Sequence, residues 1–138
     1  MFDQVKTWLA TFPQWGNTRL WVDKANYLPG SAGLFCEGLE QVNETVDILG
    51  NVTVQNRCRF SLHWVVSDQA DPQVMAQKLL DLQAWVQQQS ALGAAPQMGQ
   101  QTRWQARSGK KQEITHAMTV IYTVELTVQY QCKPHLPL

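Results

Sequence analysis

The sequence has little of what marks secreted, membrane-bound or DNA-coating proteins. Charged residues make up only 16% of the 138 residues, and 11 Lys and Arg balance 11 Asp and Glu. This balance leaves no overall positive field to supply nonspecific nucleic-acid affinity, which argues against a histone-like role. No apolar run approaches the roughly 20 residues of a membrane-spanning helix, and residues 1–10 lack the apolar core of a signal peptide. We therefore expect a soluble, cytosolic protein with no membrane partner.

Cysteine is also scarce, and its spacing argues against a stabilising cross-link. The 3 Cys residues are an odd number and include no CxxC pair, which supports neither a disulfide framework nor a short-spaced zinc site. Cys36 and Cys58 lie where a hairpin can bring them together, but a cytosolic chain keeps its thiols reduced. We expect free cysteines, no bound metal and no cofactor.

The motifs of the common enzyme classes are missing as well. The sequence contains no HExxH helix, nucleophile elbow or phosphate loop, and His63, His116 and His135 are scattered along it. Ser61 lies two positions from His63 on the same face of a predicted strand, without an oxyanion loop or a local third member to complete a triad. We therefore expect no catalytic residue and no enzyme activity.

Alternation of apolar and polar residues is the clearest positive signal. Even positions are apolar from Val52 to Val66, with Asn56 as the single polar break, and again from Met118 to Tyr130. A period of two residues is typical of a half-buried strand. Long strands are therefore predicted over residues 52–66 and 117–131.

Weaker signals predict three further strands, at residues 19–24, at residues 34–48, and from Thr102 to a turn at Ser108-Gly109. Gly38, inside the second of these, predicts a bulge or bend. Gly50-Asn51 predicts a hairpin connection from that strand into the strand at 52–66.

Two helices are predicted. Residues 1–11 have apolar side chains at helical spacing, and Pro13 follows them. A long helix begins at Asp71-Pro72, because aspartate accepts a backbone N–H at the cap and proline needs no N–H at the first helical position. Capping explains Asp71 and the nearby Asp68 more simply than a metal or acid–base pair does. The long helix should end near Ser90. Its predicted buried stripe is Met75, Leu79, Leu82 and Val86, joined by Leu80 and Trp85.

The order of these elements predicts an α+β fold in a single domain over residues 1–138. We expect a mostly antiparallel sheet, with the N-terminal helix and the long central helix packed on one face. A compact chain of this length has a diameter on the order of 35 to 40 Å, whereas ~15 residues of extended strand reach about 50 Å. The long strands must therefore either bend through bulges and twist, or project as β-hairpin arms whose edges a partner subunit covers.

The candidate interaction surface is basic. Its residues are Arg57, Arg59, His63, Arg107, Lys110 and Lys111. The first three form a row on one face of the strand at 52–66, and the others gather with Arg103 around the predicted turn. Such groups can contact phosphate, or line a ring through which nucleic acid passes. The simpler interpretation is a solvated hairpin that resists edge aggregation.

Several segments together carry a family resemblance. They are GLFCEG at 33–38, DILGN at 47–51, RCRFSL at 57–62, LQAWV at 82–86, the loop with Pro96, and IYTVEL at 121–126 with QY at 129–130. In their order along the chain and their general residue pattern, these segments resemble the tail-terminator or minor capsid proteins of prophages and long-tailed phages with non-contractile tails. The likeness covers nearly the whole chain.

The resemblance implies a structural virion protein without enzyme activity, whose working form is a homo-oligomeric ring, usually a hexamer. Such a ring caps the growing tail tube, stops its polymerisation and joins it to the head–tail connector or neck proteins. The expected partners are thus copies of the chain itself, the tail tube protein and neck proteins, with DNA passing through the lumen without specific binding. The implied location is the host bacterial cytoplasm during assembly and then the virion tail.

On this resemblance the long hairpins are inter-subunit arms, and the neutral net charge suits stacking on a protein ring better than gripping DNA. A neck or head-completion protein differs from a terminator mainly in the ring that it touches. A function of another class also fits the pattern of elements: a small cytosolic enzyme or ligand-binding α+β domain. Its pocket would lie between the sheet and the long helix, lined by Trp64, Trp85 and Tyr122.

Overall fold

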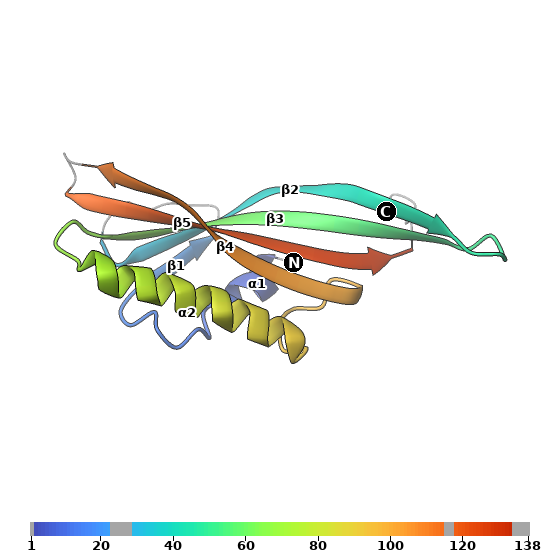
Figure 1. Ribbon diagram of the computed structural model, residues 1–138, viewed down its shortest axis with the longest axis horizontal. Coiled ribbons are helices and arrows are strands. Elements are labelled where there is room, and N and C mark those ends of the chain that lie inside the picture. The colour runs from blue at the N-terminus through green and yellow to red at the C-terminus, as the bar shows by residue number, and fades with distance from the viewer. Residues whose placement is uncertain (1, 23–28, 115–117, 134–138) are drawn as a thin grey trace.

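The computed structural model describes residues 2–22, 29–114 and 118–133. The elements run in the order α1 (Phe2–Leu9), β1 (Arg19–Val22), β2 (Ser31–Val46), β3 (Val52–Ser67), α2 (Pro72–Ala91), β4 (Gln100–Ile114) and β5 (Thr119–Cys132). In this part of the chain five strands form one sheet, ordered β1-β2-β3-β5-β4. Neighbouring strands are antiparallel except β1 and β2, which are parallel. Both helices lie on one side of the sheet (Figure 1), so the predicted α+β fold is confirmed.

The alternation in β3 and β5 determines which face of the sheet the helices cover. Phe60, Leu62 and Trp64 of β3 are at most 2% exposed, and Val124 and Leu126 of β5 are fully buried. These even-numbered positions form the apolar face, on which α1 and α2 pack. The odd-numbered positions between them form the opposite face, called here the polar face.

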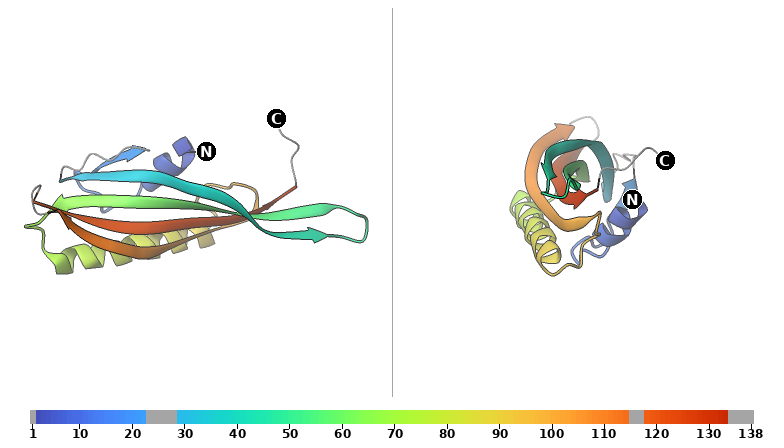
Figure 2. Two further views of the ribbon diagram at one scale, coloured as in Figure 1. Left: turned by 90° about the horizontal axis from the view of Figure 1, so that it is seen from above. Right: turned by 90° about the vertical axis from the view of Figure 1, so that its right-hand side faces the viewer.

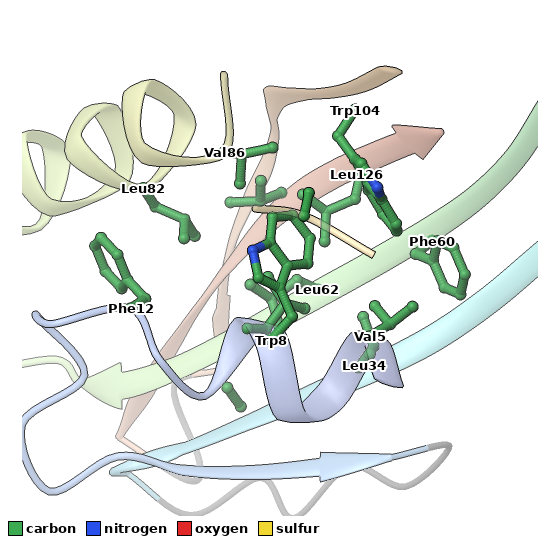
Figure 3. Packing of buried hydrophobic residues seen from close by; sticks show 14 of the residues in the cluster. Val5, Trp8, Phe12, Leu34, Phe60, Leu62, Leu82, Val86, Trp104 and Leu126 are labelled. Carbon is green, nitrogen blue, oxygen red and sulfur yellow. The ribbon is translucent and has the colours of Figure 1, made fainter. Parts of the chain in front are cut away.

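Tryptophan side chains join the two helices to the sheet. Trp8 of α1 stacks on Trp85 of α2, with 5.2 Å between ring centroids, and lies 4.8 Å from Trp104 of β4. Figure 3 shows Trp8 at the centre of this cluster, between the helices and the strands. Trp15, after α1, lies 4.6 Å from Trp64 of β3. A helix as short as α1 is marginal in water, so these indole contacts hold it in place.

The long helix forms as predicted. The carboxylate of Asp71 accepts a hydrogen bond from the backbone N–H of Gln73 at 2.9 Å, and Pro72 occupies the first helical position. Capping is therefore the role of Asp71, as the sequence indicated. The buried residues of α2 are Met75, Leu79, Leu82 and Val86, as predicted, and Trp85 is partly buried against the same core. The predicted burial of Leu80 is wrong, because this side chain is 58% exposed.

The predicted turn at Ser108-Gly109 is wrong. Strand β4 continues through this site and pairs with β5 on both sides of it, with Ser108 opposite Val124 and Lys111 opposite Tyr122. One extra residue on β4 makes the site a β-bulge. Glycine inside a strand marks a bulge as well as a turn, and only the pairing with β5 distinguishes the two. His116 and His135 lie outside the described residues.

The β2–β3 hairpin is the most extended feature of the molecule (Figures 1 and 2). Its distal half, residues 39–58, is called here the arm. Val46 pairs with Val52 across the predicted turn, and the predicted bulge at Gly38 is present, where the register shifts and φ is +138°. Glycine adopts this conformation without strain. The two alternatives for the long strands thus combine, because bulges and twist bend the hairpin and its end still projects.

Substitution of two leucines on α2 tests where the core lies. Leu82 is fully buried and Leu80 is 58% exposed. We expect Leu82→Ala to lower the free energy of unfolding by about 3 kcal/mol, through lost burial and the cavity left behind. Leu80→Ala, the matched control, should change it by less than about 0.5 kcal/mol. Urea denaturation followed by tryptophan fluorescence measures both values, and equal losses would contradict the packing described.

Candidate functional site

The row predicted on β3 lies on the polar face, where one carboxylate contacts both of its arginines. Glu40 of β2 accepts from Arg57 at 3.3 Å and from Arg59 at 2.9 Å. The Gln129 side-chain amide satisfies its neighbours when its oxygen faces Arg57. In this orientation the oxygen accepts a hydrogen bond from Arg57 at 2.9 Å. All three ion-pairing side chains are between 31% and 55% exposed, so the pairs are solvated and contribute little to stability. Glu40 therefore offsets one of the two arginine charges, and the other is not balanced within this row.

His63 has a different environment from the two arginines. Its Nε2 atom lies 2.8 Å from the hydroxyl oxygen of Ser61, and its ring centroid is 5.0 Å from that of Phe35. Burial lowers the pKa of His63, while the charge of Glu37 opposes this shift. The structure thus joins Ser61 and His63 in a hydrogen-bonded pair against an aromatic ring. A neutral imidazole in this pair satisfies the buried hydroxyl group.

The second predicted cluster is divided between the two faces of the sheet. Arg107 lies on the polar face and contacts Glu125 at 2.7 Å. The bulge in β4 reverses the alternation, so Lys111 lies on the apolar face, with its ammonium group 5.7 Å from the centroid of the Tyr122 ring. Lys110 belongs to β4, and its side chain lies outside the described residues. Lys111 therefore does not form one patch with Arg107, because the extra residue places the two on opposite faces.

An open hollow of about 1050 Å³ brings three of the predicted arginines together. Arg57, Arg59 and Arg107 line it together with Glu37 and Glu125. Its remaining wall passes across the edge strand β4 to the exposed side of α2, at Leu80, Gln83, Ala84 and Gln87. The hollow mixes both charges with aliphatic groups, which is typical of a protein-contact surface rather than an anion site.

The arm presents a surface that the sequence reasoning missed. Its exposed aliphatic residues are Leu39 (60%), Val42 (37%), Val46 (63%), Ile48 (102%) and Leu49 (82%). Exposed apolar groups gathered on one element mark contact sites. The signal was present in the sequence as two consecutive aliphatic residues inside a turn, where polar residues are usual.

The tip of the arm is held in one conformation by Asp47. Its carboxylate accepts from the backbone N–H groups of Leu49 and Asn51, each at 2.9 Å, and from the Asn51 side chain at 3.0 Å. The hydrogen bonds from Asn51 lower the pKa of Asp47, and smaller contributions from Leu49 and Gly50 act in the same direction. Ile48 and Leu49 are thus presented on an ordered turn, which reduces the entropy lost on binding.

One edge of β2 is open along the arm. Strand β1 pairs only with Ser31–Leu34, and no other described segment pairs with this side of residues 35–46. An edge of this length is a template for another strand.

The three cysteines are free thiols. Burial first, and then the neighbouring Cys36 thiol, raise the pKa of Cys58 to about 11. The two lie near each other across the β2–β3 hairpin, as the sequence suggested. A thiol with so high a pKa is unreactive at neutral pH.

The three aromatic residues that were expected to line a pocket between the sheet and the long helix pack in the core instead. Trp64 is 2% exposed and contacts Trp15, and Trp85 stacks on Trp8. Tyr122 is half-buried against the same core. The hollow lies beside this region and not between its layers.

Comparison with known proteins gives no information about the family or function of this chain. No protein-family model matches the sequence, and no curated protein matches it. Within the described ranges, neither helix combines the length and the apolar character that a membrane crossing needs. Function is therefore inferred from the surfaces described above.

Removal of the Asp47 carboxylate tests the order of the tip. We expect Asp47→Ala to speed amide hydrogen exchange at Leu49 and Asn51 by about tenfold, because each loses a bond to a charged acceptor. The pKa of Asp47 lies below its ordinary value of 3.8, so the tip is fully held above that pH and loosens as the pH falls through the lowered pKa. NMR-detected exchange measures both effects. Glu44→Ala, in the same arm, is the control, and exchange unchanged in Asp47→Ala would contradict this role.

Proposed function

We propose that this chain is a structural subunit of a phage-type tail, which assembles into a ring that caps the tail tube. The ring stops tube polymerisation and joins the tail to the neck proteins. The observation that carries the proposal is the arm: a projecting hairpin with an open strand edge, exposed aliphatic residues and an ordered tip. These are the properties of an element that is completed by another protein.

The charges on the polar face support a protein partner over a nucleic-acid partner. Three of its arginines are already paired with Glu40 or Glu125. Tight binding to DNA depends on cations that neutralise phosphates and release counterions. Ion pairs within the face reduce its number of free cations, so it holds passing DNA less tightly than an unpaired basic row would. This fits a tail component whose lumen conducts DNA.

A genetic experiment tests the function directly. Deletion of the gene from the genome that encodes the chain should give particles with tails of uncontrolled length, or tails separate from heads, because nothing ends tube growth. Electron microscopy of released particles measures tail length and attachment. Normal, attached tails of uniform length in the deletion strain would overturn the proposed function.

The role of the arm is tested in the same strain by complementation. Ile48→Ser/Leu49→Ser should fold normally, because both side chains are exposed, and should fail to restore uniform tails. Leu92→Ser, which changes a 70% exposed leucine just after α2, is the matched control and should restore them. Full restoration by the tip variant would show that the tip is not a contact.

A further inference from the structure

Two of the three free thiols lie side by side at the base of the arm. Cys36 of β2 is opposite Phe60, and Cys58 of β3 is opposite Leu39, so the two cysteines are diagonal neighbours across the hairpin. Even-numbered positions of β3 lie on the apolar face, and residues opposite them share that face. Both thiols therefore point to the same side of the sheet. They also share a side-chain hydrogen bond, so they are in contact.

The backbone beside this pair has room to adjust. A disulfide needs Cα atoms about 4.4 to 6.8 Å apart, whereas diagonal neighbours in a regular sheet lie about 7 to 8 Å apart. Bond formation thus needs a small local shift. Glu37 has no opposite residue on β3, because the register shifts between Cys36 and Gly38. A strand that is bulged at this point shifts at lower cost than one inside a regular ladder. The resulting bridge is strained and therefore easily reduced.

The third thiol is out of reach of the other two. Cys132 is opposite Val54, and Cys58 is opposite Val128. Cys132 is thus level with a residue four positions from Cys58 along β3, a separation of about 13 Å. Cys36 is level with Phe60, which is farther still. Of the three pairings that the cysteines allow in an unfolded chain, the fold permits only one.

Exposure gives the two contacting thiols different roles. Cys36 is exposed, whereas Cys58 is 2% exposed. An oxidant in the solvent therefore reaches Cys36, and the sulfenic acid that it forms condenses with a neighbouring thiol. Burial and the Cys36 thiol hold the pKa of Cys58 at about 11, so Cys58 does not react with a solvent oxidant at neutral pH. Its attack on Cys36 is intramolecular, which raises the effective concentration of the thiol.

We propose that Cys36 and Cys58 form a redox pair, in which a peroxide oxidises the two thiols to a disulfide that joins β2 to β3 and leaves Cys132 free. The Cys36 sulfur attacks the peroxide, the O–O bond breaks, and a sulfenic acid and one water form. The Cys58 sulfur then attacks the Cys36 sulfur. The S–O bond breaks, and the leaving hydroxide takes the Cys58 proton as a second water. Two thiols thus lose two electrons, and the peroxide gains them.

The bridge lies where the covered part of the sheet meets the arm. Ser31–Leu34 are buried beside β1, and Cys36 is the first exposed residue of β2 after them. A cross-link at this point limits the separation of β2 from β3. In the proposed function the chain assembles in a reducing cytoplasm and is then released into an oxidising medium, so the bridge would form after assembly. This timing rests on the proposed function, whereas the cysteine chemistry does not.

Oxidation of the full-length chain tests the pair. The reduced, folded protein is treated with hydrogen peroxide at neutral pH, unfolded, and labelled with a maleimide. We expect it to lose two of its three thiols and the mass of two hydrogen atoms, and to recover both with dithiothreitol. Mass spectrometry of its peptides should find Cys36 joined to Cys58. The same oxidation in urea should give a mixture of pairings, because the fold no longer selects one.

Serine and alanine variants assign the roles of the three cysteines. Cys36→Ser changes an exposed residue, so it should fold, and it should form no disulfide within the chain. Cys132→Ser is the matched control and should form the bridge as the unaltered chain does. Cys58→Ala should stop at the sulfenic acid of Cys36, which dimedone traps. Thermal melting checks folding, and Cys36→Ser tests the pair even where Cys58→Ala fails to fold.

Hydrogen exchange tests the effect of the bridge on the arm. Oxidation should slow amide exchange at Leu39 and Gln41 by roughly tenfold, because the cross-link suppresses local opening of the strands. Cys36→Ser treated in the same way should show no such change. Equal exchange in the oxidised and reduced chains would show that the bridge does not restrain the arm.

The pairing itself would be refuted by three kinds of result: a folded chain that keeps all three thiols, a disulfide that includes Cys132, or the same mixture of pairings with and without urea. None of these bears on the proposed function, which is measured as tail length in the deletion strain. Uniform tails in that strain would remove the proposed function and leave the redox pair in place.

Discussion

The sheet of this protein is longer than the apolar layer that covers it, and this mismatch shapes the rest of the molecule. At the start of β2, Ser31–Leu34 are buried beside β1, whereas every residue from Cys36 to Val46 is exposed. The helices and their tryptophans cover only the sheet centre. Beyond that cover the hairpin depends on strand pairing, with β5 beside β3 as far as Val54 and only two strands from there to the tip, and a two-stranded ribbon alone is marginally stable in water. At its tip the hydrogen bonds to Asp47 add further order.

Much of the fold was predictable because its signals are local. The period of two in β3 and β5, the Asp71 cap and the Gly38 bulge each depend on residues close in sequence. The bulge at Ser108-Gly109 could not be distinguished from a turn, because the difference lies in pairing with β5, a distant segment. That one extra residue also changes the composition of the candidate surface, because it places Lys111 on the face opposite Arg107.

The candidate site was harder to predict than the fold for a related reason. Sequence identifies Arg57 and Arg59 as cations on one strand face, but not that Glu40 approaches both of them. The ion pairs depend on the β2–β3 register, which the bulges shift. The exposed aliphatic residues of the arm were hidden because alternation in residues 34–48 is weak and exposure depends on where the helices end. Patterns in nearby residues therefore predicted the strands and helices, whereas the register between distant strands determined which side chains meet on the surface.

The position of the helices has a consequence for the proposed assembly. Because α1 and α2 both lie on the apolar face, each subunit is thicker on that side of the sheet (Figure 2). When such wedges join edge to edge, their thick sides spread outward and their thin sides turn inward. The polar face, with its internally paired arginines, then lines the interior of a closed ring. A lumen lined in this way is wet, and Glu40 and Glu125 offset part of the positive charge of the arginines, so the wall retains a polyanion less firmly than an unpaired cationic surface would. The ion pairs that weaken the attraction of a single chain for DNA thus suit the inner wall of the proposed conduit.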